Sequence, residues 1–338
     1  MVWDSFPEIR RELDRVRTEL LREVSRPGGR ISEGLGDLLT RDSKLLRPAF
    51  TILAARIQNG GQAADEHIIK IAAAIEMLHA ASLIHDDIID RADKRRGGEA
   101  LHVRYGDRTA VLMGDYLFAK CFSLISKYAK PESSVLISAT VGHLIESEVS
   151  EYVRGPEDGW SVRSYLHRII GKTAVLFSLS FHLGVIEASP GRADPLLVEI
   201  LRRTGYNVGV GFQIVDDVLD IFGEAEITGK PSGTDLKQGV MTLPVILAAK
   251  NGRRLELSRV LNRVSRSGAR RISLLKLWEN RTLDEARLRI EDGGGKHGAL
   301  AAAELYTRRA HRELKRLPET EERGILQAVT TQLLSRVS

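Results

Sequence analysis

The chain contains a single cysteine, Cys121, among 338 residues. One thiol excludes an intramolecular disulfide framework, so disulfide-stapled secreted folds are ruled out and a reducing, cytoplasmic compartment is expected. Aromatic residues make up only 5% of the chain, and proline occurs ten times. Because proline breaks helices, its scarcity leaves room for long helical segments.

Long hydrophobic runs are also missing. The stretch Met1–Arg30 is charged throughout and lacks the apolar segment of a signal peptide. The longest apolar candidate, Thr173–Ile186, is shorter than the ~20 residues that a membrane span needs, and it contains His182. We therefore expect core helices and no stable membrane anchor.

A large surplus of one charge is absent too, because 50 basic and 45 acidic residues leave a net charge of +5. Basic residues concentrate in Arg91–Arg96 and in the C-terminal third. No nucleic-acid-binding module or aromatic platform accompanies them, so we expect no nucleic-acid partner. A helical nucleic-acid binder is the weaker alternative, and binding that does not depend on salt would dismiss it.

Helical periodicity dominates the sequence, and period-two strand patterns are scarce. The apolar runs that carry it are Ile69–His85, Ala110–Tyr128, Val135–Val153, Tyr165–Val185 and Leu197–Phe222. Helix breakers stand at Pro27-Gly28-Gly29, Asn59-Gly60-Gly61, Gly155-Pro156, Pro190-Gly191 and Gly293-Gly294-Gly295. Thr282 and Glu285 have the spacing of a capping box at a helix start. These patterns predict one all-α domain over residues 1–338, with about ten core helices.

The most informative feature is an acidic sequence that occurs twice. It reads Asp86-Asp87-Ile88-Ile89-Asp90 and, about 130 residues later, Asp216-Asp217-Val218-Leu219-Asp220. A helix advances about 100° per residue, so positions i, i+1 and i+4 share one face. Like charges at that spacing destabilise a helix, so a purely structural role is unattractive. Two such clusters facing each other predict a site for several hard cations.

The donor set favours Mg²⁺ over other metals. Carboxylate oxygens suit Mg²⁺, whereas zinc favours cysteine and histidine ligands. A di-iron site would need Glu-x-x-His sequences, and none follows Glu146 and Glu148. The candidate metal ligands are Asp86, Asp87, Asp90, Asp216, Asp217 and Asp220.

Basic residues accompany both acidic clusters. Arg95 and Arg96 follow the first cluster by one short loop, and Lys230 follows the second by a similar interval. Lys172 interrupts another apolar helix, and Lys44 and Arg47 stand just before Pro48 at a predicted helix start. Half-buried cations are costly without partners. Several of them beside a metal site predict two polyanionic groups, most simply diphosphates, because arginine gives bidentate oxygen contacts and lysine a point charge.

From about Leu39 onward, the chain resembles the trans (head-to-tail) isoprenyl diphosphate synthases. The motifs that carry the resemblance are Lys44-Leu-Leu-Arg47-Pro48, Glu76-Met-Leu-His79, both acidic sequences, Arg95-Arg96-Gly97, Gly114-Asp115-Tyr-Leu, Lys172-Thr173, Phe212-Gln213, Thr228-Gly-Lys230, Asp235-Leu and Thr242-Leu-Pro244. One acidic sequence alone is weak evidence, whereas two in order with these companions are specific. The resemblance implies an isoprenoid synthase bundle around a central cavity. It also implies condensation of isopentenyl diphosphate with geranyl, farnesyl or geranylgeranyl diphosphate.

The resemblance also implies a role for each residue. Three Mg²⁺ bridging the allylic diphosphate should be bound by Asp86, Asp90 and Asp216, with the shell oriented by Asp87, Asp217 and Asp220. The residues expected to hold the allylic diphosphate are Arg95, Lys172 and Lys230. Those expected to hold isopentenyl diphosphate are Lys44, Arg47, His79 and Arg96. Oxygen dipoles of Thr173 and Gln213 should stabilise the developing carbocation.

Three motifs depart from the family pattern. Asp42-Ser43-Lys44-Leu45 stands where the family usually has Gly-Gly-Lys-Arg. Val240 replaces a usual lysine, and Ser147-Glu148 with Glu151 replaces a Gly-Glu…Gln pattern. These changes put in doubt the flexibility of the Lys44 loop and one contact to the allylic diphosphate.

Product length is expected to depend on Ala81 and Ser82, one helical turn before the first acidic cluster. Small residues there leave a tunnel open, which predicts a medium- to long-chain polyprenyl diphosphate. Geranylgeranyl diphosphate is the alternative, because Met77, Leu78, Met113, Phe118 or Phe122 could close the tunnel deeper down.

Two other readings remain. A terpene cyclase would keep one acidic cluster and replace the second with an Asn/Ser/Glu metal motif. A regulatory subunit of a heteromeric prenyl synthase would typically lose both clusters. The chain retains both, which favours an active enzyme, and a homodimer is expected because two-fold dimers are the commonest assembly.

Overall fold

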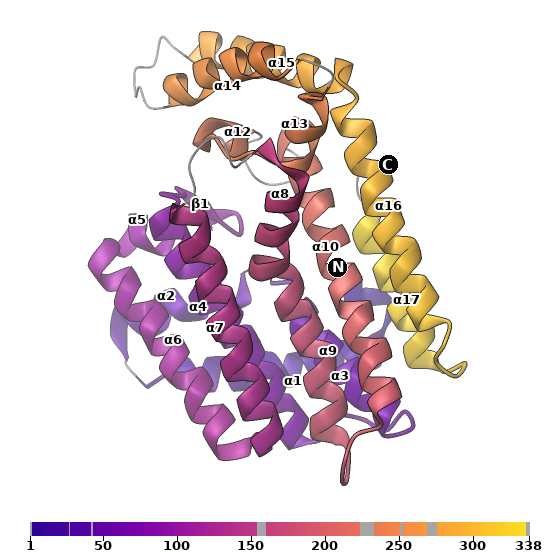
Figure 1. The fold of residues 1–338 in the computed structure, drawn as a ribbon. Coiled ribbons are helices and arrows are strands. Elements are labelled where there is room, and N and C mark those ends of the chain that lie inside the picture. Colours follow the sequence, from indigo (N-terminus) through magenta and orange to yellow (C-terminus); the bar gives the residue numbers. More distant parts are fainter. Residues whose placement is uncertain are drawn as a thin grey trace. The chain divides into compact units, whose positions relative to one another are not determined.

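A computed structural model describes residues 2–26, 28–41, 43–153, 160–223, 233–250, 253–268 and 276–335. The described chain is helical almost throughout, so the all-α prediction is confirmed (Figure 1). The exception among these residues is a hairpin of β1 (Lys94–Arg95) and β2 (Gly98–Glu99), paired antiparallel. The chain divides into two compact units, and the single domain over residues 1–338 stays a prediction.

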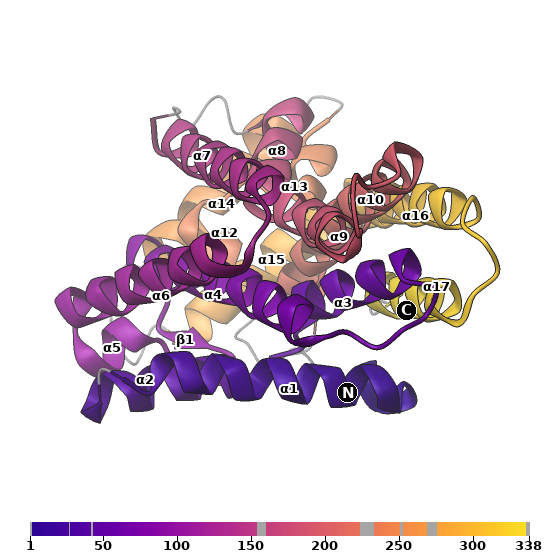
Figure 2. The same ribbon diagram turned by 90° about the horizontal axis from the view of Figure 1, so that it is seen from below.

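The first unit comprises Met1–Gly142, Val175–Tyr206 and Ala310–Thr330. Its helices are η1 (Val2–Ser5), α1 (Pro7–Val24), α2 (Gly29–Thr40), α3 (Leu46–Gln58), α4 (Glu66–Ile89), α5 (Leu101–Tyr105), α6 (Asp107–Tyr128) and α9 (Val175–Ala188). Helix α1 starts at a proline and buries an apolar face at i+3 and i+4 spacing: Ile9, Leu13, Val16, Leu20 and Val24. That face lets α1 pack along α2, α3 and α4 (Figure 2).

The second unit comprises His143–Ala174, Asn207–Arg309 and Thr331–Ser338. Its helices are α8 (Val162–Ile169), the π-helical turn η3 (Ile170–Ala174), α12 (Thr234–Gln238), α13 (Leu243–Ala248), α14 (Arg254–Gly268) and α15 (Lys276–Asp292). Four further helices contribute residues to both units: α7 (Pro131–Val153), α10 (Pro195–Phe222), α16 (Gly295–Leu314) and α17 (Glu321–Leu334). The end of α10 joins α12–α15 in one apolar core that includes Ile221, Val245, Leu257 and Leu283.

All five predicted helical runs are helical, although the fourth is interrupted by the π-helical turn. The predicted breaks at Asn59, Pro190 and Gly293 lie between helices, and Gly155-Pro156 lies outside the described residues. The capping-box interpretation of Thr282 and Glu285 was wrong, because both lie inside α15, which begins at Lys276. A local sequence pattern there is overridden by a helix that starts upstream.

The expectation that no segment is long and apolar enough for a membrane span was wrong. Among the described residues, three helices reach that length and composition: Glu66–Ile89, Asp107–Tyr128 and Val162–Ala188. In the first and the third, 72% of the most apolar window is buried inside the protein. In α6 the buried share is only 39%, so this helix presents apolar side chains to the outside.

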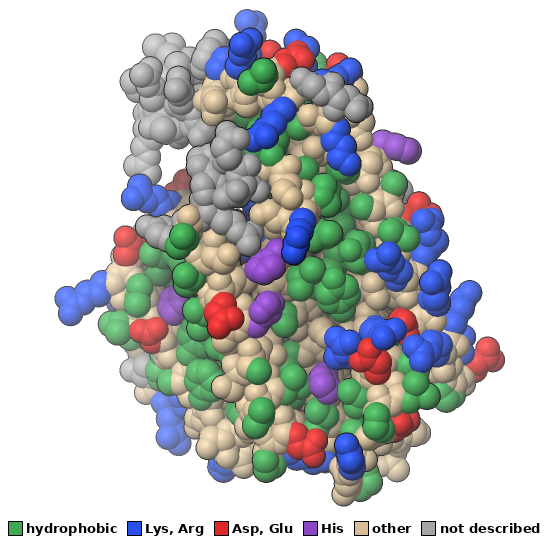
Figure 3. Space-filling model, viewed as in Figure 1, with side chains coloured by type: hydrophobic (Ala, Val, Ile, Leu, Met, Phe, Trp, Pro, Cys, Tyr) green, Lys and Arg blue, Asp and Glu red, His purple; other side chains and the backbone are tan. Residues whose placement is uncertain are grey.

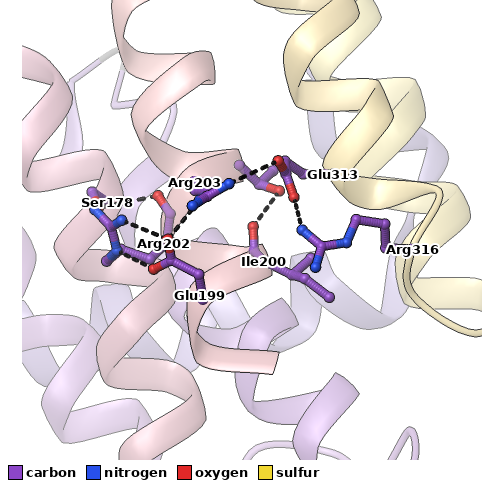
Figure 4. Close-up of polar contacts among 8 residues, drawn as sticks. Ser178, Glu199, Ile200, Arg202, Arg203, Glu313 and Arg316 are labelled. Atoms are coloured by element: carbon purple, nitrogen blue, oxygen red, sulfur yellow. Dashed lines mark hydrogen bonds and ion pairs between the residues drawn. The ribbon is translucent and has the colours of Figure 1, made fainter. Parts of the chain in front are cut away.

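The basic C-terminal surface contains carboxylates as well as arginines. Lys and Arg side chains gather over α16 with Asp and Glu among them (Figure 3). Near the start of α10, Glu199 accepts hydrogen bonds from Arg202 and Arg203, which lower its pKa to about 2. Glu313 lies 3.8 Å from Arg203 and 2.5 Å from Arg316, so ion pairs link α10 to the end of α16 (Figure 4).

Candidate active site

The first acidic cluster lies at the C-terminal end of α4. Asp65 caps the start of this helix, because its side chain accepts a hydrogen bond from the backbone N–H of Ile68, and Asp90 directly follows the last helical residue, Ile89. Asp87 is buried, whereas Asp86 is half-buried and Asp90 is exposed. The predicted fan of carboxylates is therefore uneven, because its middle member turns into the protein.

The hairpin after α4 brings two arginines back to the helix. Its loop residues, Arg96 (φ 48°) and Gly97 (φ 73°), both have positive φ, as a tight two-residue hairpin requires. Arg95 thereby donates to both oxygens of Asp87, with Nε 2.8 and 3.1 Å away, and its Nη2 also contacts Oδ1. Burial would lower the pKa of Arg95, but its hydrogen bonds to Asp87 and the nearby Asp86 and Asp90 charges raise it.

Buried Glu76 organises the residues predicted to bind isopentenyl diphosphate. Arg96 donates to Glu76 Oε1 (3.3 Å) and to the Leu38 carbonyl (2.7 Å). Ser43, which replaces a usual glycine, donates its hydroxyl to the same Glu76 oxygen at 3.2 Å. The departure at Ser43 therefore adds an anchor to this loop.

Arg47 and His79 are two more of the residues predicted to bind isopentenyl diphosphate. The Arg47 guanidinium stacks 4.7 Å from the centroid of the Phe177 ring, and its Nε is buried without a hydrogen-bond partner among the described residues. Burial lowers the pKa of Arg47 to about 10, although Glu76 opposes the shift. Burial, followed by the charges of Arg47, Arg96 and Arg95, lowers the pKa of His79 well below its usual value, so its imidazole is neutral. The group is suited to an anion that needs no metal.

The second acidic cluster lies on α10 and repeats the uneven burial of the first. Asp217 is 4% exposed, whereas Asp216 and Asp220 are half-buried. Asp217 accepts hydrogen bonds from Tyr165 Oη (2.6 Å) and Gln213 Nε2 (2.9 Å). Burial raises the pKa of Asp217 to about 6, and these two donors oppose the shift.

A chain of hydrogen bonds extends from Asp217 to the π-helical turn. Thr173 Oγ1 donates to Gln213 Oε1 at 2.7 Å, which brings together the two residues predicted to stabilise the carbocation. Lys172, on the same turn, lies 3.4 Å from Glu148. A side chain at Gly171 would lie only 2.1 Å from the Ser147 hydroxyl, so the close approach of α7 requires glycine. π-Helical turns are frequent at functional sites.

Asp220 uses its carboxylate to start α12. Its oxygens accept hydrogen bonds from the backbone N–H groups of Thr234 (3.2 Å) and Asp235 (3.1 Å). Asp220 is therefore fixed by backbone donors, which fits the orienting role that the resemblance implies. Lys230, predicted to hold the allylic diphosphate, lies outside the described residues.

The predicted chain-length positions lie on α4 facing the protein interior. Ala81 is fully buried, and the hydroxyl of half-buried Ser82 donates to the carbonyls of Leu78 (3.0 Å) and His79 (3.2 Å). Helix α6 approaches α4 one turn later, where a Cβ on Gly114 would lie 2.3 Å from His85 Nε2. Among the residues proposed to close a tunnel, Met77, Leu78 and Met113 are buried, whereas Phe122 is 44% exposed.

Within the described part of the chain, no three His, Cys, Asp or Glu side chains are gathered into one metal-binding group. Magnesium is usually bound through one or two protein carboxylates, with water and substrate phosphates completing the shell. Each acidic cluster offers carboxylates of this kind on a rigid helix. The donor set therefore fits Mg²⁺ that substrate completes.

Several residues of the site were not found by sequence reasoning. Tyr165 and Arg168 had no recognisable motif, and Glu76 had a motif but no role. Arg168 bonds both Glu151 (3.2 Å) and the Met241 carbonyl (2.9 Å), next to Val240. The pairing of Tyr165 with Asp217 spans 52 residues, so no local pattern could reveal it.

Comparisons with known proteins agree with this geometry. The family model described as Polyprenyl synthetase matches residues 30–276. The chain is 38% identical over 242 residues to heptaprenyl diphosphate synthase component 2 of Geobacillus stearothermophilus, covering 72% of this chain and 74% of that protein. It is 31% identical to nonaprenyl diphosphate synthase of Mycobacterium tuberculosis, covering 97% and 93%. A solved structure of polyprenyl synthase from Caulobacter crescentus CB15, complexed with calcium and isoprenyl diphosphate, matches with a TM-score of 0.85 at 30% identity, covering 97% and 96%.

Proposed function

The chain belongs to the polyprenyl synthetase family and is a trans-prenyltransferase, and we propose that it extends an allylic diphosphate with isopentenyl diphosphate to a medium- or long-chain all-trans product. The main support is the acidic sequence that occurs twice in the chain. In both copies its middle aspartate, Asp87 or Asp217, is buried and hydrogen-bonded. In both, the outer carboxylates retain solvent access.

Isopentenyl diphosphate is held by the cations around Glu76. Arg47 and Arg96 supply fixed positive charge, Lys44 supplies a point charge from its loop, and neutral His79 supplies a hydrogen bond. The unpartnered Nε of Arg47 is a donor that a diphosphate oxygen can take. Because this group already contains more cations than carboxylates, the non-allylic diphosphate binds without a metal.

The allylic diphosphate is held where the acidic clusters are. The residues that would hold Mg²⁺ are Asp86, Asp90 and Asp216, with Asp87, Asp217 and Asp220 fixing their orientation. Bound Mg²⁺, expected to number three, would supply Lewis-acid stabilisation of the departing diphosphate. Arg95, Lys172 and Lys230 add positive charge to the same leaving group.

For the condensation itself, the protein mainly positions the two substrates and keeps water out of the site. The allylic C–O bond breaks, the oxygens of Thr173 and Gln213 stabilise the cation, and the double bond of isopentenyl diphosphate forms the new C–C bond. The proton lost from the condensed product goes to the departing diphosphate. Apolar walls exclude water that would otherwise quench the cation.

The reaction is tested with purified protein, Mg²⁺, isopentenyl diphosphate and farnesyl diphosphate, followed by mass analysis of the products. A polyprenyl diphosphate longer than the primer is expected. Diphosphate release without isopentenyl diphosphate would instead indicate a cyclase. If the protein alone elongates no primer and gains activity when a second protein is added, the regulatory-subunit interpretation is supported.

A medium- or long-chain product is supported by the small residues Ala81 and Ser82 and by the relatives named for heptaprenyl and nonaprenyl products. Geranylgeranyl diphosphate remains the alternative product, because Met77, Leu78 and Met113 are buried near this part of α4 and α6. Ala81→Phe should shorten the product on chromatography, whereas Ala301→Phe, on the exposed face of α16, should not. An unchanged product length in Ala81→Phe would contradict the assignment.

A homodimer is proposed to form through the outer face of α6. That face exposes Val111, Leu112 and Phe122, which fall within an arc of about 100° around the helix axis. Leu112→Glu should halve the mass measured by light scattering, whereas Leu196→Glu, at a similarly exposed leucine on α10, should not. The Geobacillus relative is component 2 of a heptaprenyl diphosphate synthase, which favours a heteromeric partner as the second candidate. A wild-type chain that is monomeric alone would support that candidate.

A further inference from the structure

The N-terminal segment contacts the loop that carries Lys44. Trp3, in η1, is only 4% exposed, and its indole N–H donates to the Lys44 carbonyl at 2.6 Å. Residues 41 positions apart are thus joined by one short hydrogen bond. The family motifs begin near Leu39 and the family model matches from residue 30, so neither includes this segment.

The loop that Trp3 contacts has a strained backbone. Leu45 has φ 45° and ψ 41°, a left-handed conformation that a leucine seldom adopts, and it precedes the first residue of α3. Its side chain is buried, and its carbonyl accepts the first α3 hydrogen bond, from Ala49 N–H at 3.0 Å. Such conformations persist only where surrounding contacts hold them, and they concentrate at functional sites.

The loop borders a small cavity on the side of α1. This cavity, about 70 Å³ in volume and open to solvent, is lined by Lys44 and Leu45 together with Trp3, Leu13 and Arg17. Hydrogen bonds hold the loop from two directions: Trp3 donates to the Lys44 carbonyl, and the Ser43 hydroxyl donates to Glu76. One anchor comes from the N-terminal segment and the other from α4.

We propose that Trp3 is a positioning residue for isopentenyl diphosphate. By holding the Lys44 carbonyl, it keeps the Leu45 backbone in the conformation that presents Lys44 and Arg47 together. A loop fixed before binding loses less conformational entropy when the diphosphate arrives. This role rests on the proposed function of Lys44 and Arg47 as ligands of isopentenyl diphosphate.

The kinetic test is Trp3→Phe, which keeps an aromatic ring but removes the N–H donor. We expect KM for isopentenyl diphosphate to rise about three- to tenfold, the value of one hydrogen bond, while kcat and KM for the allylic diphosphate stay within about twofold. The matched control is Tyr116→Phe, which removes a comparable side-chain hydrogen bond to a carbonyl, that of Glu23, at 3.2 Å. Equal changes in both KM values, or no change in either, would overturn the proposal.

A second measurement does not require turnover. In hydrogen exchange, Trp3→Phe should speed exchange in the peptide spanning residues 43–50 and leave the rest of α3 and α4 unchanged, and saturating inorganic diphosphate should restore protection. Uniformly faster exchange throughout the first unit, as from simple destabilisation, would overturn the proposal. If wild-type protein makes no polyprenyl product but this local exchange pattern holds, the proposed function fails, whereas Trp3 still positions the Lys44 loop for a diphosphate.

Discussion

The two acidic sequences have identical aspartate spacing but different surroundings. In the first unit, the buried middle carboxylate, Asp87, is bound by the charged guanidinium of Arg95. In the second unit, the buried middle carboxylate, Asp217, is bound by two neutral donors, Tyr165 and Gln213. Burial raises the pKa of Asp217 to about 6, and neutral donors offset that cost only in part.

The difference shows how one motif is supported in two ways. Asp87 is paired with Arg95, which is itself expected to bind the allylic diphosphate. The Asp87 carboxylate and the diphosphate therefore compete for one guanidinium. Tyr165 has no such second task, and Gln213 also accepts from Thr173. We therefore expect the first cluster to be coupled to substrate binding, whereas hydrogen bonds connect the second to the π-helical turn that carries Lys172 and Thr173.

The largest expected effect comes from removing an outer carboxylate of either cluster. Asp86→Asn and Asp216→Asn should each lower kcat at least about a thousandfold. Each removes a carboxylate that is expected to bind the Mg²⁺ whose charge stabilises the departing diphosphate. Steady-state assays over a range of Mg²⁺ concentrations measure this. Full turnover by either variant would show that its cluster is not part of the catalytic site.

Loss of one of the arginines near Glu76 should weaken the binding of one substrate only. Arg47→Met should raise KM for isopentenyl diphosphate about 10- to 100-fold, because a charged hydrogen bond is lost from a buried site. KM for the allylic diphosphate should change little. A parallel rise in both values would mean that the two diphosphates share this group.

Support of the second cluster is tested by Tyr165→Phe. Removing the hydroxyl that fixes Asp217 should raise the Mg²⁺ concentration needed for half-maximal activity about tenfold. Loss of a residue that hydrogen-bonds a metal ligand typically lowers metal affinity about 10- to 100-fold, and we expect the low end of this range. Thr307→Val, which removes a hydroxyl bonded to the Ala303 carbonyl on α16, is the control in the same unit. An equal shift in both variants would assign the effect to general stability.

The smallest effect is expected at His79. Because burial and the charges of Arg47 and Arg96 lower its pKa well below 6.5, the imidazole is neutral throughout the range from pH 6.5 to 8. His79→Asn, which keeps a neutral donor, should therefore raise KM for isopentenyl diphosphate by no more than about threefold. A loss as large as that of Arg47→Met would show that His79 carries charge in the complex.

Much of the fold was predictable because long apolar periodicity is a local property. The predicted companions Arg47 and Arg96 also lie near one glutamate, Glu76, and close enough to His79 to lower its pKa. The sequence could not show which aspartate of each cluster is buried, because that depends on partners such as Tyr165, 52 residues away. Local patterns also misled at Thr282, where a helix that begins upstream overrides the capping signal.

Helix α4 carries His79, which is predicted to bind an anion, the predicted chain-length positions, and Asp86 and Asp87 of the first acidic cluster in one rigid segment. At 1.5 Å per residue, Ala81 and Asp86 are separated by about 7.5 Å along the helix axis, and that spacing cannot change without changing the helix itself. Inserting one residue between them would rotate the carboxylates by about 100° away from their present direction. Under the proposed assignment, product length changes here by exchange of single side chains, so relatives with different products should differ in residue identity along α4 while keeping its length.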